Sequence, residues 1–252
     1  MTRLPRSRGW LTAALLLSLS ILAIHPSPSM GGDKNSPTGF SDHLLIPESP
    51  YLFTNSITLW NGYRNDHIEP GLGADNLDFY QLGLEADLHW DKINAIGSID
   101  YGWGSQGTDS LDWLAGFGYD IDLTVTGIQL TPLAGYGASH LNRDARYNSE
   151  WAGPFLGAKL EVPLAEKWLL QASYFYHWAA FESELSTPAV VINRADAAGH
   201  TGRLDLIYQV NERLDLKLGT EIQSFTSEAG SFSRTAADWE SWGVRVGVSL
   251  KF

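Results

Sequence analysis

Carboxylates and histidines are the side chains of this chain that could do chemistry, because its 252 residues include no cysteine. The seven histidines are scattered, and no group of carboxylates has the spacing of a metal site. His177 could carry a proton, although a hydrogen-bonded structural histidine is the simpler interpretation. The sequence therefore predicts no catalytic residue, no metal ligand and no cofactor. The lack of cysteine also excludes disulfides and the attachment of lipid to a cysteine.

The first 30 residues have the order of a secretory signal peptide. Arg3, Arg6 and Arg8 form a basic start, an apolar run covers residues 11–24, and small and turn-forming residues follow. The apolar run is too short to span a bilayer comfortably as a helix. We therefore expect residues 1–30 to be a signal peptide, 31–50 a flexible segment, and 51–252 the folded domain.

The expected mature chain is strongly acidic. The whole chain has 17 Lys and Arg against 29 Asp and Glu, and the leader holds three of the basic residues, which leaves 14. Nucleic-acid binding is excluded because phosphate contacts need a basic surface. Acidity that keeps an exported protein soluble before assembly is the preferred interpretation, and an acidic lumen or mouth that favours cations is the alternative.

From about residue 50 the sequence alternates between apolar and polar residues. In residues 80–90 one face is apolar with an aromatic residue at each end, and the other face is polar or small. Lipid-facing β-strands need both features, because aromatic rings prefer the two bilayer interfaces. The apolar face of this segment comprises Tyr80, Leu82, Leu84, Ala86, Leu88 and Trp90.

Eight further segments repeat this pattern, and a less regular one lies around residues 56–66, with Trp60 on the inner side. Ten strands fit an up-and-down barrel whose two ends lie on one side, while eight or twelve are the alternatives, twelve if residues 189–193 add a strand. Connections two, four, six and eight are short, including one near residues 122–124, and the odd-numbered connections are longer. Short periplasmic turns alternating with longer external loops are typical of such barrels. The sequence thus predicts an all-β fold, a closed antiparallel up-and-down transmembrane β-barrel of ten strands.

The last eight residues, 245–252, read RVGVSLKF. They resemble the C-terminal signal of bacterial outer-membrane β-barrel proteins, in which apolar residues alternate up to a terminal aromatic residue, here Phe252. The resemblance implies location in the cell outer membrane and recognition by the barrel assembly machinery. Independently, the terminal strand must pair with the first strand to remove the open edge of the sheet.

Residues 60–66 (WNGYRND) and 151–155 (WAGPF) resemble segments of uncharacterised small outer-membrane barrels, and ten strands are also found in the omptin proteases. An omptin-like protease would activate water between an acidic pair and an Asp–His pair at the external mouth. The corresponding residues here are Asp109 with Asp112 and Asp196 with His200. Their spacings of three and four differ from the spacing of two in omptins, which puts catalysis in doubt.

The inward faces of the segments carry opposite charges, which need partners when buried. We expect a network of ion pairs that crosses and fills the lumen, and a narrow water-filled conduit is the alternative. Inward glycines leave room for bulky neighbours or for water. The expected charges are Glu85, Asp87, Asp100, Asp120, Glu161, Asp205 and Glu221 against Lys159, Arg203, Lys217 and Arg245.

These patterns favour a monomeric, non-catalytic, structural or surface-exposed outer-membrane protein with at most a narrow pore. Its expected surroundings are outer-membrane lipids and lipopolysaccharide. The alternative is a hydrolase that acts at the external mouth. A lipid-acting hydrolase would need a serine and a histidine close together on the outer face near the rim, and the sequence reveals no such pair.

Overall fold

The computed structural model of the chain describes residues 55–69, 75–104, 107–123, 127–143, 147–185, 191–227 and 238–252. The chain divides into two compact units, Met1–His43 and Leu44–Phe252, and every described residue belongs to the second. The predicted signal peptide and flexible segment therefore lie outside the described residues. Within the described ranges, no helix is long and apolar enough to cross a membrane.

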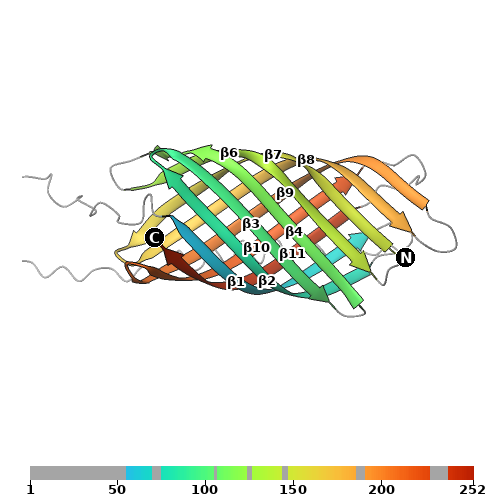
Figure 1. Ribbon diagram of the computed structural model, residues 1–252, viewed down its shortest axis with the longest axis horizontal. Coiled ribbons are helices and arrows are strands. Elements are labelled where there is room, and N and C mark those ends of the chain that lie inside the picture. The colour runs from blue at the N-terminus through green and yellow to red at the C-terminus, as the bar shows by residue number, and fades with distance from the viewer. Residues whose placement is uncertain are drawn as a thin grey trace, which may run out of the picture. The chain divides into compact units, whose positions relative to one another are not determined.

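The described residues form one closed antiparallel sheet (Figure 1). Its elements are β1 (Ser56–Glu69), β2 (Asp75–Trp90), β3 (Ile93–Gly104), β4 (Thr108–Tyr119), β5 (Ile121–Asp122), β6 (Gln129–Arg143), β7 (Tyr147–Ala165), β8 (Trp168–Leu185), β9 (Val191–Asn211), β10 (Leu214–Ser227) and β11 (Asp238–Lys251). The two-residue β5 continues the pairing of β4 with β6 in the same register, so that β4 and β5 act as one strand. The predicted ten-stranded barrel is confirmed, and residues 191–193 begin β9 rather than adding a strand.

Closure of the barrel is made by β1 and β11, which pair along their whole lengths. The backbone N–H of Phe252 also donates to the carbonyl oxygen of Asn55, at 3.0 Å. Stepping from partner to partner around the sheet from Ser56 returns to β1 at Ile68, twelve residues farther along. This stagger requires strands that tilt steeply against the barrel axis, as Figure 1 shows.

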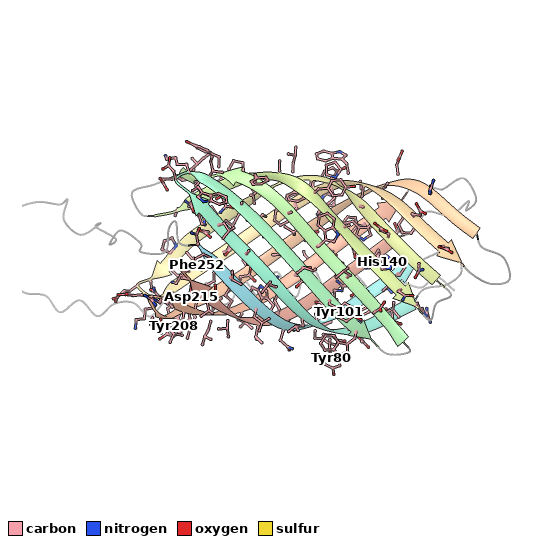
Figure 2. All side chains as sticks on the ribbon, in the orientation of Figure 1. Tyr80, Tyr101, His140, Tyr208, Asp215 and Phe252 are labelled. Atoms are coloured by element: carbon pink, nitrogen blue, oxygen red, sulfur yellow. The ribbon has the colours of Figure 1, made fainter. Side chains whose placement is uncertain are left out.

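The outer face carries the predicted apolar rows. Tyr80 and Trp90, at the two ends of the apolar row of β2, are 64% and 59% exposed. The ten residues from one to the other span about 33 Å along a strand, at about 3.3 Å per residue. With a tilt of about 40° they cover about 25 Å along the axis, which matches the apolar band of outer-membrane barrels. Figure 2 places Tyr208 and Phe252 near one end of the barrel, and Tyr80 and Tyr101 toward the other.

Two expectations about the connections need correction. The strands extend farther than predicted on the external side, so that only residues 70–74, 105–107, 144–146 and 186–190 separate the first four external pairs of strands. Antiparallel pairing of β8 with β9 continues beyond the aromatic rows and includes the pair Glu182 and Arg194. The side chains of this pair also interact, with Arg194 Nε donating to Glu182 Oε2 at 2.9 Å. The connection predicted to be tight near residues 122–124 covers residues 123–128 and is longer than the external connection at 105–107.

Candidate functional site

The lumen contains the charged residues that the sequence predicts to face inward, and all of them except Asp100 belong to two groups of ion pairs. The first, here called the lower cluster, consists of Asp87, His89, Asp120, Lys159 and Glu161. Lys159 Nζ lies 2.6 Å from Asp87 Oδ2 and 3.5 Å from Glu161 Oε1. His89 Nδ1 lies 2.8 Å from Asp120 Oδ2, and His89 Nε2 lies 3.1 Å from Asp87 Oδ1. Because β7 and β2 are four strands apart around the barrel, the Lys159–Asp87 pair crosses the lumen.

The second group, the central cluster, lies on the wall formed by β9, β10, β11, β1 and β2. The carboxylate of Glu85 lies 3.3 Å from Lys217 Nζ and 3.9 Å from nitrogens of both Arg203 and Arg245. Arg245 also lies 3.1 Å from Asp205, and its guanidinium carbon is 4.1 Å from the ring centre of Trp60. Arg203 donates a further hydrogen bond to Glu221. Each cation thus has carboxylate partners, as the burial of charge requires.

Above the central cluster, Arg64 joins two strands through carboxylates. Its guanidinium donates to Asp112 of β4, and its Nη2 donates to Asp66 Oδ2 of β1 at 3.0 Å. Ser139 of β6 donates to the same Asp112. The side chains of Arg64 and Asp66 are almost fully buried. Sequence reasoning missed Arg64 and Asp66, because the alternation of the first segment is irregular.

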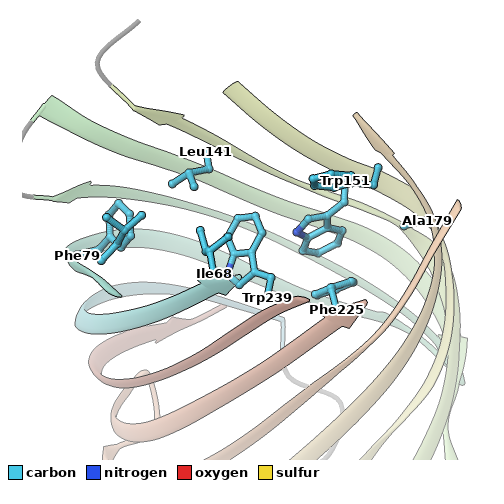
Figure 3. Close-up of a cluster of buried hydrophobic side chains, with 9 residues drawn as sticks. Ile68, Phe79, Leu141, Trp151, Ala179, Phe225 and Trp239 are labelled. Atoms are coloured by element: carbon cyan, nitrogen blue, oxygen red, sulfur yellow. The ribbon is translucent and has the colours of Figure 1, made fainter. Parts of the chain in front are cut away.

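The lumen also contains apolar side chains that the sequence analysis did not place there. Leu114, Leu133, Phe155 and Phe175 form one buried cluster. Nine residues form a second cluster, here called the aromatic plug and drawn in Figure 3: Ile68, Leu77, Phe79, Leu141, Trp151, Ala179, Phe181, Phe225 and Trp239. The rings of Trp151 and Phe225 stack with centroids 3.6 Å apart. Most plug residues lie near the external ends of their strands. Apolar residues on both faces of these ends were the signal that could have predicted the plug.

Three small cavities lie between these groups in the described part of the barrel. One of about 30 Å³ lies beside Glu85, Lys159 and Phe175, and another of about 20 Å³ lies between Arg64 and Arg245. A third, of about 10 Å³, lies among the plug residues. A water molecule needs about 10–15 Å³ on this measure. These cavities therefore accommodate single water molecules or a few, and no larger solute.

His177 lies beneath the plug with its side chain buried. Its Nε2 lies 3.2 Å from the hydroxyl oxygen of Thr201, and its ring centre is 5.6 Å from those of Trp151 and Phe155. The interpretation of His177 as a hydrogen-bonded lumen histidine is confirmed. Within the described residues, no group of three or more His, Asp or Glu side chains is arranged to hold a metal ion.

The four residues considered for hydrolysis at the mouth do not converge. Asp112 points into the lumen, where Arg64 and Ser139 bind it. Asp109, three positions earlier, is on the outer face, and its carboxylate lies 3.5 Å from the hydroxyl of Tyr101. Asp196 and His200 are exposed on the outer face of β9. The sheet therefore separates Asp112 from His200, because side chains of a strand alternate between its faces.

Comparison with known proteins agrees with this architecture. A family model described as Protochlamydia outer membrane protein matches residues 137–252, which run from β6 to the C-terminus. The chain is an outer-membrane β-barrel protein. Its location in the cell outer membrane, expected from the C-terminal resemblance, is thereby confirmed. No curated protein sequence matches this chain.

Several solved barrels have a similar arrangement of strands at low sequence identity. The outer membrane protease OmpT from Escherichia coli is 13% identical, with 79% of this chain and 95% of OmpT covered and a TM-score of 0.48. The translocator domain of the autotransporter NalP from Neisseria meningitidis is 14% identical, with 97% and 98% covered and a TM-score of 0.42. The attachment invasion locus protein Ail of Yersinia pestis is 12% identical, with 79% and 99% covered and a TM-score of 0.33. Such identities carry no information about activity.

Proposed function

We propose that this outer-membrane barrel is a structural, surface-exposed protein whose lumen is a packed core, with at most a narrow path for small solutes. The observation that carries the proposal is the ion pair between Lys159 and Asp87, which spans the lumen at 2.6 Å. A channel for hydrated ions would have to break this pair. Separating the partners would leave an uncompensated buried charge, which costs about 3–5 kcal/mol.

The aromatic plug supports the same proposal at the external end. Its stacked rings come from β7 and β10, and Trp239 joins them from β11. These strands are held in the closed sheet on both edges. The plug is therefore built from side chains of the barrel strands themselves, and opening it would require repacking several strands.

Ion conduction across a planar lipid bilayer tests this proposal. The folded protein should insert without giving a steady current in 1 M potassium chloride, while a porin inserted under the same conditions provides the positive control. Brief, irregular openings fit a narrow path. A steady current of reproducible size in every insertion would contradict a packed lumen.

We also propose that the protein is a monomer surrounded by outer-membrane lipids, including lipopolysaccharide, and that the barrel assembly machinery inserts it. The lipid-facing rows and the terminal Phe252, which is 67% exposed on the outer face, support this. Light scattering of the detergent-solubilised protein should give the mass of one chain, and a multiple of that mass would contradict it. A peptidase at the mouth is not proposed, because Asp112 and His200 lie on opposite faces of the sheet.

A further inference from the structure

A row of polar side chains crosses the outer face of β8 to β11 near the external rim. The sheet register pairs each member with the next, and the members are Tyr176, His200, Ser224 and Glu240. His200 and Ser224 are both exposed. Direct cross-strand neighbours have Cβ atoms about 4.5–5.5 Å apart, so a change of rotamer can bring the serine hydroxyl to the imidazole. The expectation that no serine and histidine adjoin on the outer face is therefore wrong.

Two tryptophans indicate the depth at which His200 and Ser224 lie in the membrane. Trp178 pairs with Ala198, two residues from His200, and Trp242 pairs with Ile222, two residues from Ser224. Both tryptophans are 48% exposed on the lipid-facing surface. Tryptophan prefers the interface between the hydrocarbon and the polar headgroups. His200 and Ser224 therefore lie where the ester bonds of outer-leaflet lipids are found.

The ring of His200 is held by its neighbours. Its Nδ1 shares a hydrogen bond with the hydroxyl of Tyr174, and its ring centre is 5.0 Å from that of Tyr176 in an edge-on arrangement. When Nδ1–H donates to the Tyr174 oxygen, Nε2 becomes the basic nitrogen. Tyr174 is then a positioning residue that fixes the tautomer in which His200 can accept a proton.

We propose that Ser224 and His200 form a slow hydrolase site for acyl esters of outer-leaflet lipids. The Ser224 oxygen attacks the ester carbonyl carbon, and its proton passes to His200 Nε2. The proton then moves to the departing alcohol oxygen as the carbon–oxygen bond breaks, which leaves an acyl ester on Ser224. Water hydrolyses that ester with His200 as base, which releases the fatty acid and restores the serine. This activity is separate from the structural role of the lumen.

The local backbone explains why the reaction should be slow. The part of β10 around Ser224 pairs with both β9 and β11, so that its N–H groups are used in the sheet and form no oxyanion hole. Loss of one oxyanion donor lowers kcat by about 100- to 1,000-fold in a serine hydrolase. Covalent labelling of the serine is therefore a more sensitive readout than turnover.

The test uses the full mature chain folded into vesicles of phosphatidylethanolamine and phosphatidylglycerol. A fluorophosphonate probe measures labelling of Ser224 by mass spectrometry, and release of fatty acid measures hydrolysis. A second set of vesicles contains lipopolysaccharide, and ether-linked phospholipids provide the non-hydrolysable control. Ser224→Ala should abolish labelling, and His200→Gln should slow it by about 100-fold. Thr226→Ala removes a hydroxyl from the same face of β10 and should change neither readout.

Tyr174→Phe tests positioning, because it should shift the pH at which labelling is half-maximal while leaving the barrel folded. Heat-modifiable migration in gels establishes that each variant is folded. Fatty acid released only with phospholipid vesicles assigns glycerophospholipids as the substrate, and release only with lipopolysaccharide assigns its acylated lipid. The proposal is overturned if Ser224 takes up no probe and no fatty acid appears, or if Ser224→Ala leaves both signals unchanged. Neither outcome bears on conduction, which tests the structural role separately.

Discussion

Lys159 and Asp87 lie 72 positions apart in the sequence and meet across the lumen, with 2.6 Å between Nζ and Oδ2. Both side chains are largely buried, at 3% and 14% exposure. Lys159 also contacts Glu161, and Asp87 also contacts His89. This one pair therefore links opposite walls of the barrel and anchors the lower cluster.

Lys159→Met should destabilise the protein strongly. Methionine keeps most of the apolar stem but removes the charge, which leaves Asp87 and Glu161 without their cation. Loss of one partner of a buried ion pair costs about 3–5 kcal/mol. Urea-induced unfolding in lipid vesicles measures the change in the free energy of unfolding.

The exposed Lys167, in the turn between β7 and β8, provides the matched control, and Lys167→Met should change the stability by less than about 0.5 kcal/mol. Combining Lys159→Met with Asp87→Asn should cost less than the sum of the two single changes, because the pair is then neutral on both sides. Strict additivity would contradict a direct interaction.

Gly135→Ala should also destabilise the barrel, for a steric reason. A Cβ at Gly135 would lie 2.2 Å from the carbonyl oxygen of Ala115 and 2.6 Å from Phe155 Cζ. Overpacking of this kind costs about 1–3 kcal/mol. Gly97→Ala is the comparison, since its Cβ would meet only the carbonyl oxygen of Leu114 at 3.9 Å. Equal unfolding midpoints for the two variants would contradict the close packing at Gly135.

Phe225→Ala should weaken the aromatic plug without opening a channel. The substitution removes the ring that stacks on Trp151 and should lower the stability by about 3–5 kcal/mol. The central and lower clusters still fill the lumen beneath it, so that planar-bilayer recordings should show no steady current. A steady current in this variant would mean that the plug alone closes a channel.

Phe252→Ala should reduce assembly more than it reduces stability. Phe252 is 67% exposed on the outer face, and its backbone hydrogen bond to Asn55 does not depend on the side chain. Fewer folded copies should reach the outer membrane, as measured by heat-modifiable migration of membrane fractions. Phe117 is equally exposed but lies within β4, and Phe117→Ala should assemble at the normal level. Equal assembly of the two variants would contradict a special role of the terminal ring.

The sequence by itself determined the strands and their lipid-facing side, and it favoured ten strands over eight or twelve. Lipid contacts one whole face of each strand, so that every second residue must be apolar, and this rule can be read along a single strand such as residues 80–90. The even strand count placed Phe252 at the same end of the barrel as the start of the first strand, next to Asn55. The alternation is less regular in residues 56–66, where the inward position of Trp60 was predicted and is confirmed, while the inward Arg64 was missed.

Only the tertiary structure decided which side chains meet. The closed sheet and its twelve-residue stagger bring Lys159 to Asp87 and Arg64 to Asp112, and these distances depend on the register of every strand between them. The aromatic plug was not predicted from the sequence, because a closed lumen permits apolar residues on the inner face as well. The pairing of His200 with Ser224 likewise depends on the register of β9 against β10. A shift of one residue would separate them, because it would turn one of the two side chains into the lumen.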